Sequence, residues 1–79
     1  MTLKIISAVE IVFEGEVQSI TLPGAKGNFT VLNHHASLIS TLTKGNLVYR
    51  QSDSGSENTV AISGGLADID NNVISVCIY

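Results

Sequence analysis

The side chains best suited to chemistry in this sequence are two adjacent histidines and an acidic cluster near its end. His34 and His35 could ligate a metal ion, since imidazole nitrogens are common zinc ligands. Neighbouring residues of a strand point to opposite faces, so the two rings cannot readily share one ion. Asp68, Asp70 and residues 71–72 resemble a calcium loop in residue type, but the glycine and the later glutamate of such loops are missing. The sequence therefore predicts no metal site, and we interpret the acidic cluster as part of a hairpin.

Groups that could catalyse a reaction are also few. Glu10, Glu14 and Glu16 are close in sequence and could form a carboxylate pair for acid–base catalysis. No apolar pocket is evident around them, so we interpret them as a solvated rim. Ser63–Gly65 lacks the spacing of a nucleophile elbow, and no Gly-x-x-x-x-Gly-Lys-Ser/Thr loop is present to hold a triphosphate. The sequence therefore predicts a protein that is not an enzyme and that binds no cofactor.

The charge pattern excludes further classes of protein. The net charge is −3, and the four Lys and Arg residues are scattered along the chain. Nucleic-acid binding draws its affinity from clustered Lys and Arg, so we expect no nucleic-acid partner. No apolar run approaches the roughly eighteen residues that a membrane-spanning helix needs, and no targeting segment is recognisable. The sequence predicts a domain that does not insert into a membrane.

The size and composition indicate a partner. With 79 residues the chain is predicted to be a single domain, 1–79, and so small a domain buries only about 60% of its unfolded surface. Small domains usually gain stability from disulfides, a metal or a partner, and Cys77 as the single cysteine excludes an internal disulfide. Charged residues make up 14% of the chain, below the roughly 25% of ordinary globular domains. We infer that part of the surface is covered by another protein.

Short runs of β-branched residues separated by glycine and asparagine predict an all-β fold, a sandwich or flattened barrel. Side chains alternate along a strand, so Ile11 and Phe13 are expected on one face and Val12 on the other. The final run, Val73–Tyr79, carries apolar residues on both faces. Its second apolar face could belong to the domain's own core or to a protein interface, and both readings remain open.

Turn residues mark the ends of the strands. Pro23 and Gly24 end the run Val17–Leu22, and Gly24 is expected to allow a positive φ. Asn71-Asn72 is typical of a two-residue hairpin turn, and Gly64-Gly65 indicates a bulge or tight bend.

Residues 32–42 are ambiguous. Their apolar residues recur at helical spacing, and Asn33 could cap a helix. The β-branched Ile39, Thr41 and Thr43 favour an extended conformation instead, which we predict.

Three segments together resemble the N-terminal domain of the ATP synthase epsilon subunit, called delta in mitochondria. The match runs in order along essentially the whole chain. The matching segments are Val12–Gly24 with its Leu-Pro-Gly turn, Gly27–Ile39 with His35-Ala36 in place of a His-Ala-Pro-Leu motif, and Ala61–Val76 with its Ser-Gly-Gly sequence. Asn33 and Ser37 stand where the family often has proline, and Leu66 replaces the usual Phe.

The resemblance implies an all-β sandwich of about ten short strands. The family usually continues into a two-helix C-terminal hairpin, and this chain stops at Tyr79, so we expect the sandwich without the hairpin. It also implies a non-catalytic central-stalk subunit of a proton-translocating F-type ATP synthase. Such a subunit links the gamma subunit to the c-ring, peripheral on the cytoplasmic face of a bacterial inner membrane.

By position, two segments match the family region that faces the ring. The expected c-ring contacts are Lys26, Gly27, Asn28, Phe29, His34, His35 and Ala36. For the gamma contact the sequence indicates only an apolar outer face. The alternative is a generic small β-sandwich binding module for an oligosaccharide or peptide, which would group its aromatic residues on one face. A small hydrolase or metal enzyme would need convergent titratable groups, and a lipoyl-type carrier would need an acidic residue beside Lys44.

Overall fold

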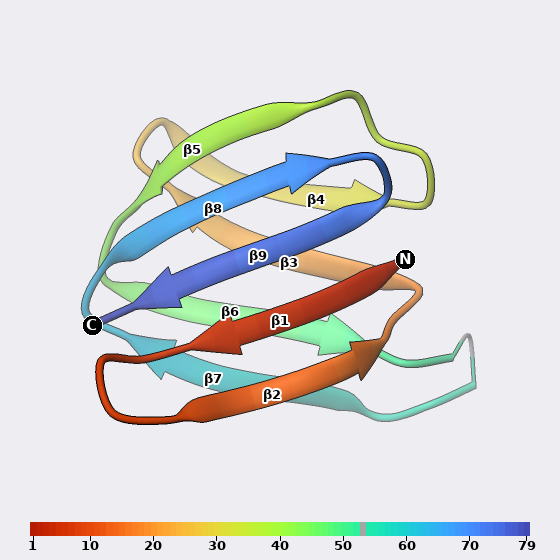
Figure 1. Ribbon diagram of the computed structural model, residues 1–79, viewed down its shortest axis with the longest axis horizontal. Helices are drawn as coiled ribbons and strands as arrows, with labels where there is room; N and C mark the ends of the chain where they lie inside the picture. Colours follow the sequence, from red (N-terminus) through yellow and green to blue (C-terminus); the bar gives the residue numbers. More distant parts are fainter. Residues whose placement is uncertain (53) are drawn as a thin grey trace.

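The computed structural model describes residues 1–52 and 54–79, which form nine β-strands and no helix (Figure 1). The predicted all-β class is confirmed. The nine strands also agree with the expected number of about ten short strands. None of the described segments forms a helix capable of crossing a bilayer. The strands are β1 (Thr2–Ile6), β2 (Ile11–Glu16), β3 (Ser19–Gly24), β4 (Gly27–Leu32), β5 (Leu38–Leu42), β6 (Gly45–Arg50), β7 (Glu57–Ile62), β8 (Gly65–Asp70) and β9 (Val73–Ile78).

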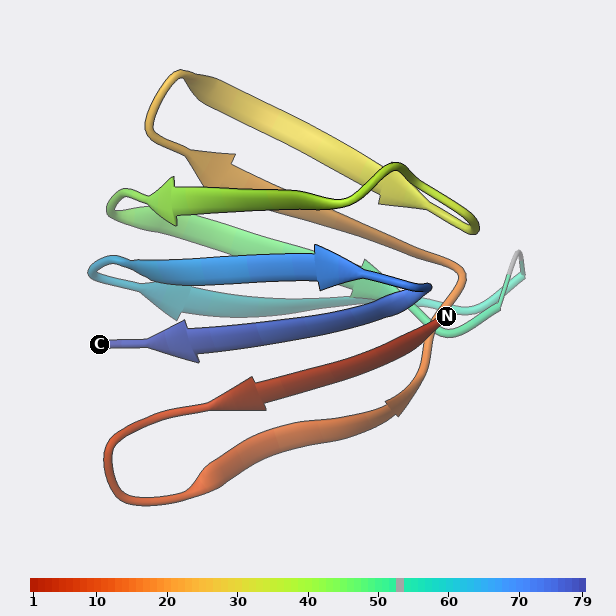
Figure 2. The same ribbon diagram turned by 45° about the horizontal axis from the view of Figure 1, so that its top comes forward.

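The strands form one curled sheet that folds over into two layers (Figure 2). The front layer has the order β2-β1-β9-β8-β5, and the back layer consists of β7, β6, β3 and β4. The layers join at a corner where Gly24 of β3 pairs with Leu42 of β5. Among the described pairs, β1 and β9 run parallel and the others run antiparallel. The result is a flattened, partly open barrel, as the sequence predicts.

The core fills the space between the two layers. Side chains alternate between faces along each strand, and in β8 this leaves Ala67 and Ile69 buried while Leu66, Asp68 and Asp70 are exposed. The fully buried side chains come from both layers, so one continuous apolar core holds the layers together. The largest of them are Leu3, Ile5, Ile20, Leu22, Val31, Leu47, Ile69, Ile74 and Val76.

A β-bulge in the pairing of β1 with β2 overturns one prediction. Ile5 lies opposite Phe13, but the next residue, Ile6, lies opposite Ile11, so Val12 is the extra residue of the bulge. Phe13 consequently packs against the core beside Ile5, whereas Ile11 is 56% exposed. Simple alternation would have placed Ile11 and Phe13 on one face. The expectation is wrong here because an inserted residue reverses the facing of the residues on one side of it.

The turns follow the predicted residues with one correction. Asn71 and Asn72 both have positive φ, 52° and 63°, as a two-residue hairpin turn of type I′ requires. In the β3–β4 hairpin the positive φ, 123°, falls on Gly27 and not on Gly24. A side chain on Gly24 would instead collide with the Phe29 ring, 2.8 Å from the position of its Cβ. Gly24 is therefore needed for close packing and Gly27 for backbone conformation.

Residues 32–42 contain no helix, and the predicted extended conformation is found at Leu38–Leu42. β4 ends at Leu32, a turn and loop follow over 33–37, and β5 begins at Leu38. The strand connections gather at two ends of the molecule because most neighbouring strands are antiparallel. The β3–β4 turn and the C-terminus lie at one end, and the β4–β5 loop and the N-terminus lie at the other (Figure 1).

Candidate interaction surfaces

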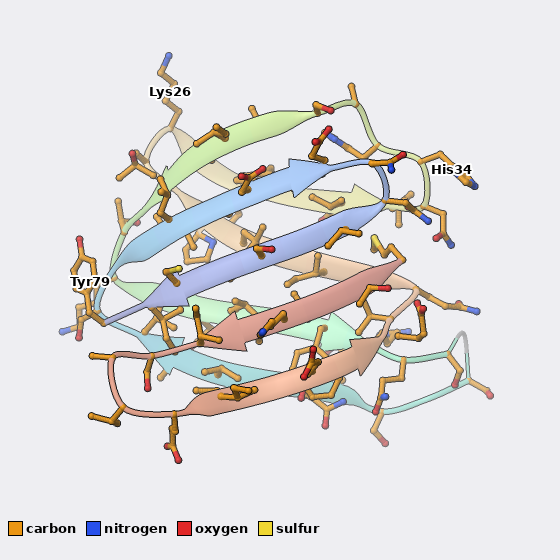
Figure 3. The ribbon with its side chains drawn as sticks, in the orientation of Figure 1. Lys26, His34 and Tyr79 are labelled. Carbon is orange, nitrogen blue, oxygen red and sulfur yellow. The ribbon has the colours of Figure 1, made fainter. Side chains whose placement is uncertain are left out.

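The residues expected to contact the c-ring lie at the two ends of β4. Lys26 is in the exposed turn between β3 and β4, and His34 is in the exposed loop that follows β4. Figure 3 places these two side chains at opposite ends of the side of the sandwich that β4 and β5 form. A strand of this length spans about 20 Å. The structure therefore arranges the predicted contacts along one edge, which we call the β4–β5 edge, instead of gathering them in one cluster.

The first group, Lys26–Phe29, directly follows residues of β3 and the β3–β4 turn that are bonded to β5 and to the residue after it. The Ala25 amide donates to the Thr41 carbonyl (3.0 Å), and the Thr43 amide donates to the Pro23 carbonyl (2.8 Å). Lys26, Gly27 and Asn28 are exposed, whereas Phe29 is half-buried and packs against the core. An open groove of about 310 Å³ lies beside this hairpin, lined by residues 24–27, Phe29 and residues 38–41.

The second group, His34–Ala36, is exposed and belongs to a loop that is bonded to the β8–β9 hairpin. His34 has a φ of 64°, and the His35 amide donates to the Leu32 carbonyl (3.2 Å). The His34 amide donates to Asn72 Oδ1 (2.9 Å), and Ser37 Oγ donates to Asp70 Oδ1 (2.6 Å). An open hollow of about 560 Å³ lies between the loop and the hairpin. Among the described residues, no three His, Cys, Asp or Glu side chains are placed to hold a metal ion.

Three apolar side chains on the same edge were missed as contact candidates. Leu32, Leu38 and Ile39 are 58%, 38% and 68% exposed. Leu38-Ile39 could have been recognised from sequence, because adjacent apolar residues in a strand cannot both face the core. Among the described residues, β4 pairs only with β3. The backbone N–H and C=O groups on the other side of β4 are therefore unpaired, and such an edge strand can pair with another protein.

A second apolar surface crosses the outer face of the front layer. The strand registers pair Ile11 with Ile6, Ile6 with Cys77, and Cys77 with Leu66. These four residues therefore form one row across β2, β1, β9 and β8, which we call the front row. Ile11 and Leu66 are 56% and 48% exposed, and Tyr79 beyond the end of β9 is 78% exposed. The outward side of β9 thus carries apolar Val73 and Cys77 on either side of Ser75, and all three are exposed among the described residues.

The aromatic residues are not grouped on one outer face. Phe13 and Tyr49 pack together with ring centroids 4.4 Å apart, and Phe13 contacts the core in which Tyr49 is buried. Phe29 packs against the same core, and Tyr79 is exposed at the end of the chain. The alternative binding module requires a shared aromatic face, which this arrangement does not provide.

The family model for the beta-sandwich domain of the ATP synthase delta/epsilon chain matches residues 1–78. The chain belongs to this family. The predicted resemblance is therefore confirmed over nearly every residue, and the curled all-β sheet agrees with the sandwich that the family description names.

Several relatives in the delta/epsilon family carry the name ATP synthase epsilon chain. The chain is 38% identical over 76 residues to the protein of Campylobacter jejuni subsp. doylei and 41% identical over 70 residues to that of Sulfurovum sp.. These matches cover 96% and 89% of this chain but 58% and 54% of the two relatives. A third relative, from Rickettsia typhi, is 42% identical over 74 residues. The chain thus spans a little over half the length of the first two relatives.

Solved structures of ATP synthases contain similar folds. A chain in the mitochondrial ATP synthase of Euglena gracilis, solved as OSCP/F1/c-ring, superimposes with a TM-score of 0.87 at 26% identity. That match covers 96% of this chain and 48% of the other. A chain in the central stalk/c-ring structure from Tetrahymena thermophila superimposes with a TM-score of 0.80 at 15% identity, which indicates a shared fold.

Proposed function

We propose that this chain is a non-catalytic part of the rotor of a proton-translocating F-type ATP synthase, where it links the gamma subunit to the c-ring. The observation that carries the proposal is the family match over residues 1–78. It is supported by the similarity to a chain of the Euglena gracilis OSCP/F1/c-ring structure. In this role the domain would lie peripherally on the cytoplasmic face of a bacterial inner membrane.

The work that such a domain performs is mechanical. Proton passage turns the ring, and a linking domain must carry that rotation to the stalk without shearing. A single core shared by both layers suits this task, because any slip of one layer over the other would expose side chains such as Leu3, Ile20 and Ile69. Exposing one such side chain costs about 1.5–3 kcal/mol, and several would be exposed together.

The β4–β5 edge is proposed as the surface that faces the c-ring. It carries the seven expected contacts together with the apolar side chains of Leu32, Leu38 and Ile39. The expected contacts are Lys26, Gly27, Asn28, Phe29, His34, His35 and Ala36. An edge with one cation, several polar groups and exposed apolar side chains suits a polar rim around an apolar contact.

The front row is proposed as the gamma-facing surface. It offers contiguous apolar side chains over four strands, and such patches on a small domain mark protein contacts. The outer face of the back layer is less suitable because it is largely polar, with Thr21, Thr30 and Thr59 aligned across β3, β4 and β7 through Val48. The two proposed surfaces are distinct, so one domain can hold both partners at once.

The proposal is tested by mixing the purified chain with the gamma subunit of the same organism and analysing the mixture by gel filtration. A rotor domain is expected to elute with gamma as a stoichiometric one-to-one complex. Separate elution at low salt, with both proteins folded by circular dichroism, would contradict the proposal and favour an independent binding module.

A further inference from the structure

Asn72 connects the β8–β9 turn to the loop that carries His34, His35 and Ala36. Its Oδ1 accepts a hydrogen bond from the His34 amide (2.9 Å), and its Nδ2 lies 3.5 Å from Asn33 Oδ1. Its own carbonyl accepts from the Thr2 amide (3.1 Å), which anchors the turn to β1. One residue thus joins the β4–β5 loop to the front layer.

The loop needs such an anchor because residues 33–37 belong to no strand. The His35 amide bonds to the carbonyl of Leu32 at the end of β4, which is close to the loop in sequence. The bonds that tie the loop to distant parts of the described chain involve Asn72, Asp70, which accepts from Ser37, and the Met1 amino group, which donates to Asn33 Oδ1 (2.8 Å). An open hollow of about 560 Å³ lies beside the loop, and residues 33–37 are all exposed, so these hydrogen bonds are its main attachment among the described residues.

The backbone conformation of His34 indicates what the hydrogen bond to Asn72 stabilises. A residue with a side chain rarely adopts a positive φ, and His34 has a φ of 64°. Such a conformation persists when the surrounding contacts determine it. The bond from the His34 amide to Asn72 Oδ1 fixes the peptide group next to that φ angle, and with it the direction in which the loop presents the His35 and Ala36 side chains.

The conformation of Asn72 allows this contact. Asn72 has a φ of 63° and is half-buried, whereas its neighbour Asn71 has a similar φ of 52° and is exposed. Asparagine tolerates this left-handed conformation. The two residues share the same turn, so a comparison between them separates the role of the Asn72 side chain from the role of the turn.

We propose that Asn72 is a positioning residue that holds the His34–Ala36 loop in the conformation that meets the c-ring. The effect of Asn72 on c-ring binding rests on the proposed function, whereas its effect on the conformation of the loop does not. Glycine suits a positive φ, so Asn72→Gly preserves the turn and removes the side-chain acceptor. Asn71→Gly is the matched control, and Asn72→Asp restores an oxygen acceptor at the same position.

The first measurement is amide hydrogen exchange at His34 in the isolated chain, followed by NMR. A neutral hydrogen bond contributes about 0.5–1.5 kcal/mol, so Asn72→Gly should accelerate exchange at this amide about three- to tenfold. Asn71→Gly should leave the rate unchanged, and Asn72→Asp should restore most of the protection. Equal exchange rates at His34 in Asn72→Gly and Asn71→Gly would overturn the proposal.

The second measurement is the affinity of each variant for the detergent-solubilised c-ring of the same organism, with urea unfolding in parallel. Asn72→Gly should bind about three- to tenfold more weakly than Asn71→Gly, at matched stability, and Asn72→Asp should recover the affinity. Unchanged ring affinity despite faster exchange would overturn the role of Asn72 in ring contact. Failure of the unmodified chain to bind the ring would count against the proposed function, and the exchange rates would still decide whether Asn72 holds the loop.

Discussion

Gly65 packs so closely on Cys77 that a Cβ on residue 65 would collide with the Cys77 carbonyl oxygen. The contact is between backbones of the paired strands β8 and β9, so neither side can yield by rotating a side chain. Gly65 is also buried at the start of β8. The β8–β9 hairpin therefore depends on a residue without a side chain at this position.

We predict that Gly65→Ala destabilises the domain by about 3 kcal/mol, at the upper end of the cost of overpacking. The free energy of unfolding from urea titration measures this. Gly15→Ala is the matched control, because its Cβ would meet the end of the Phe13 side chain at 3.1 Å and not a backbone atom. An equal loss of stability in Gly65→Ala and Gly15→Ala would contradict the explanation that a backbone collision destabilises Gly65→Ala.

The bulge between β1 and β2 predicts opposite results for two neighbouring apolar residues. Phe13→Ala should destabilise the domain by about 3 kcal/mol, because it removes contacts with the core and with the Tyr49 ring. Ile11→Ala should change stability by less than about 1 kcal/mol, because Ile11 faces outward. Urea unfolding measures both. A similarly large loss of stability in both variants would contradict the bulge, because it would place both side chains on the inner face.

The front row predicts a defect in gamma binding without a defect in folding. Leu66→Glu places a charge in the apolar row at a half-exposed position, so the stability should change by less than about 1 kcal/mol. The affinity for gamma should fall at least about tenfold, because a charge would be buried without a partner. Thr59→Glu, on the exposed face of the back layer, is the control and should bind normally. Calorimetric titration with gamma makes the comparison, and a larger loss in Thr59→Glu would place the gamma contact on the back layer.

The β4–β5 edge predicts that changes at its two ends weaken assembly on the c-ring. Asn28→Trp adds bulk to an exposed position of β4, and His35→Ala removes an exposed ring from the loop. Each should lower the affinity for the c-ring about tenfold if it lies among the few residues that carry most of the binding energy, whose loss costs over about 1 kcal/mol each. Thr59→Trp adds the same bulk away from this edge and serves as the control. Unchanged proton-coupled ATPase activity of reassembled membranes with both variants would remove the assignment.

Much of this architecture could be predicted because it follows from local preferences. Alternating β-branched runs gave the all-β class, and Asn71-Asn72 gave a hairpin turn through the tolerance of asparagine for positive φ. The extended conformation of Leu38–Leu42 followed from its β-branched residues. The motif order in the sequence also indicated the family that the match over residues 1–78 confirms.

The sequence by itself determined the class of fold, most of its turns and the family, since each depends on the residue types within a short stretch of chain. Only the tertiary structure decided which apolar residues reach the surface and which distant residues meet. The bulge that turns Ile11 outward depends on the partner strand, and the contact between Asn72 and His34 spans 38 residues. Pairing between distant segments determines both the outward direction of Ile11 and the contact between Asn72 and His34. No local preference encodes the register in which those segments pair.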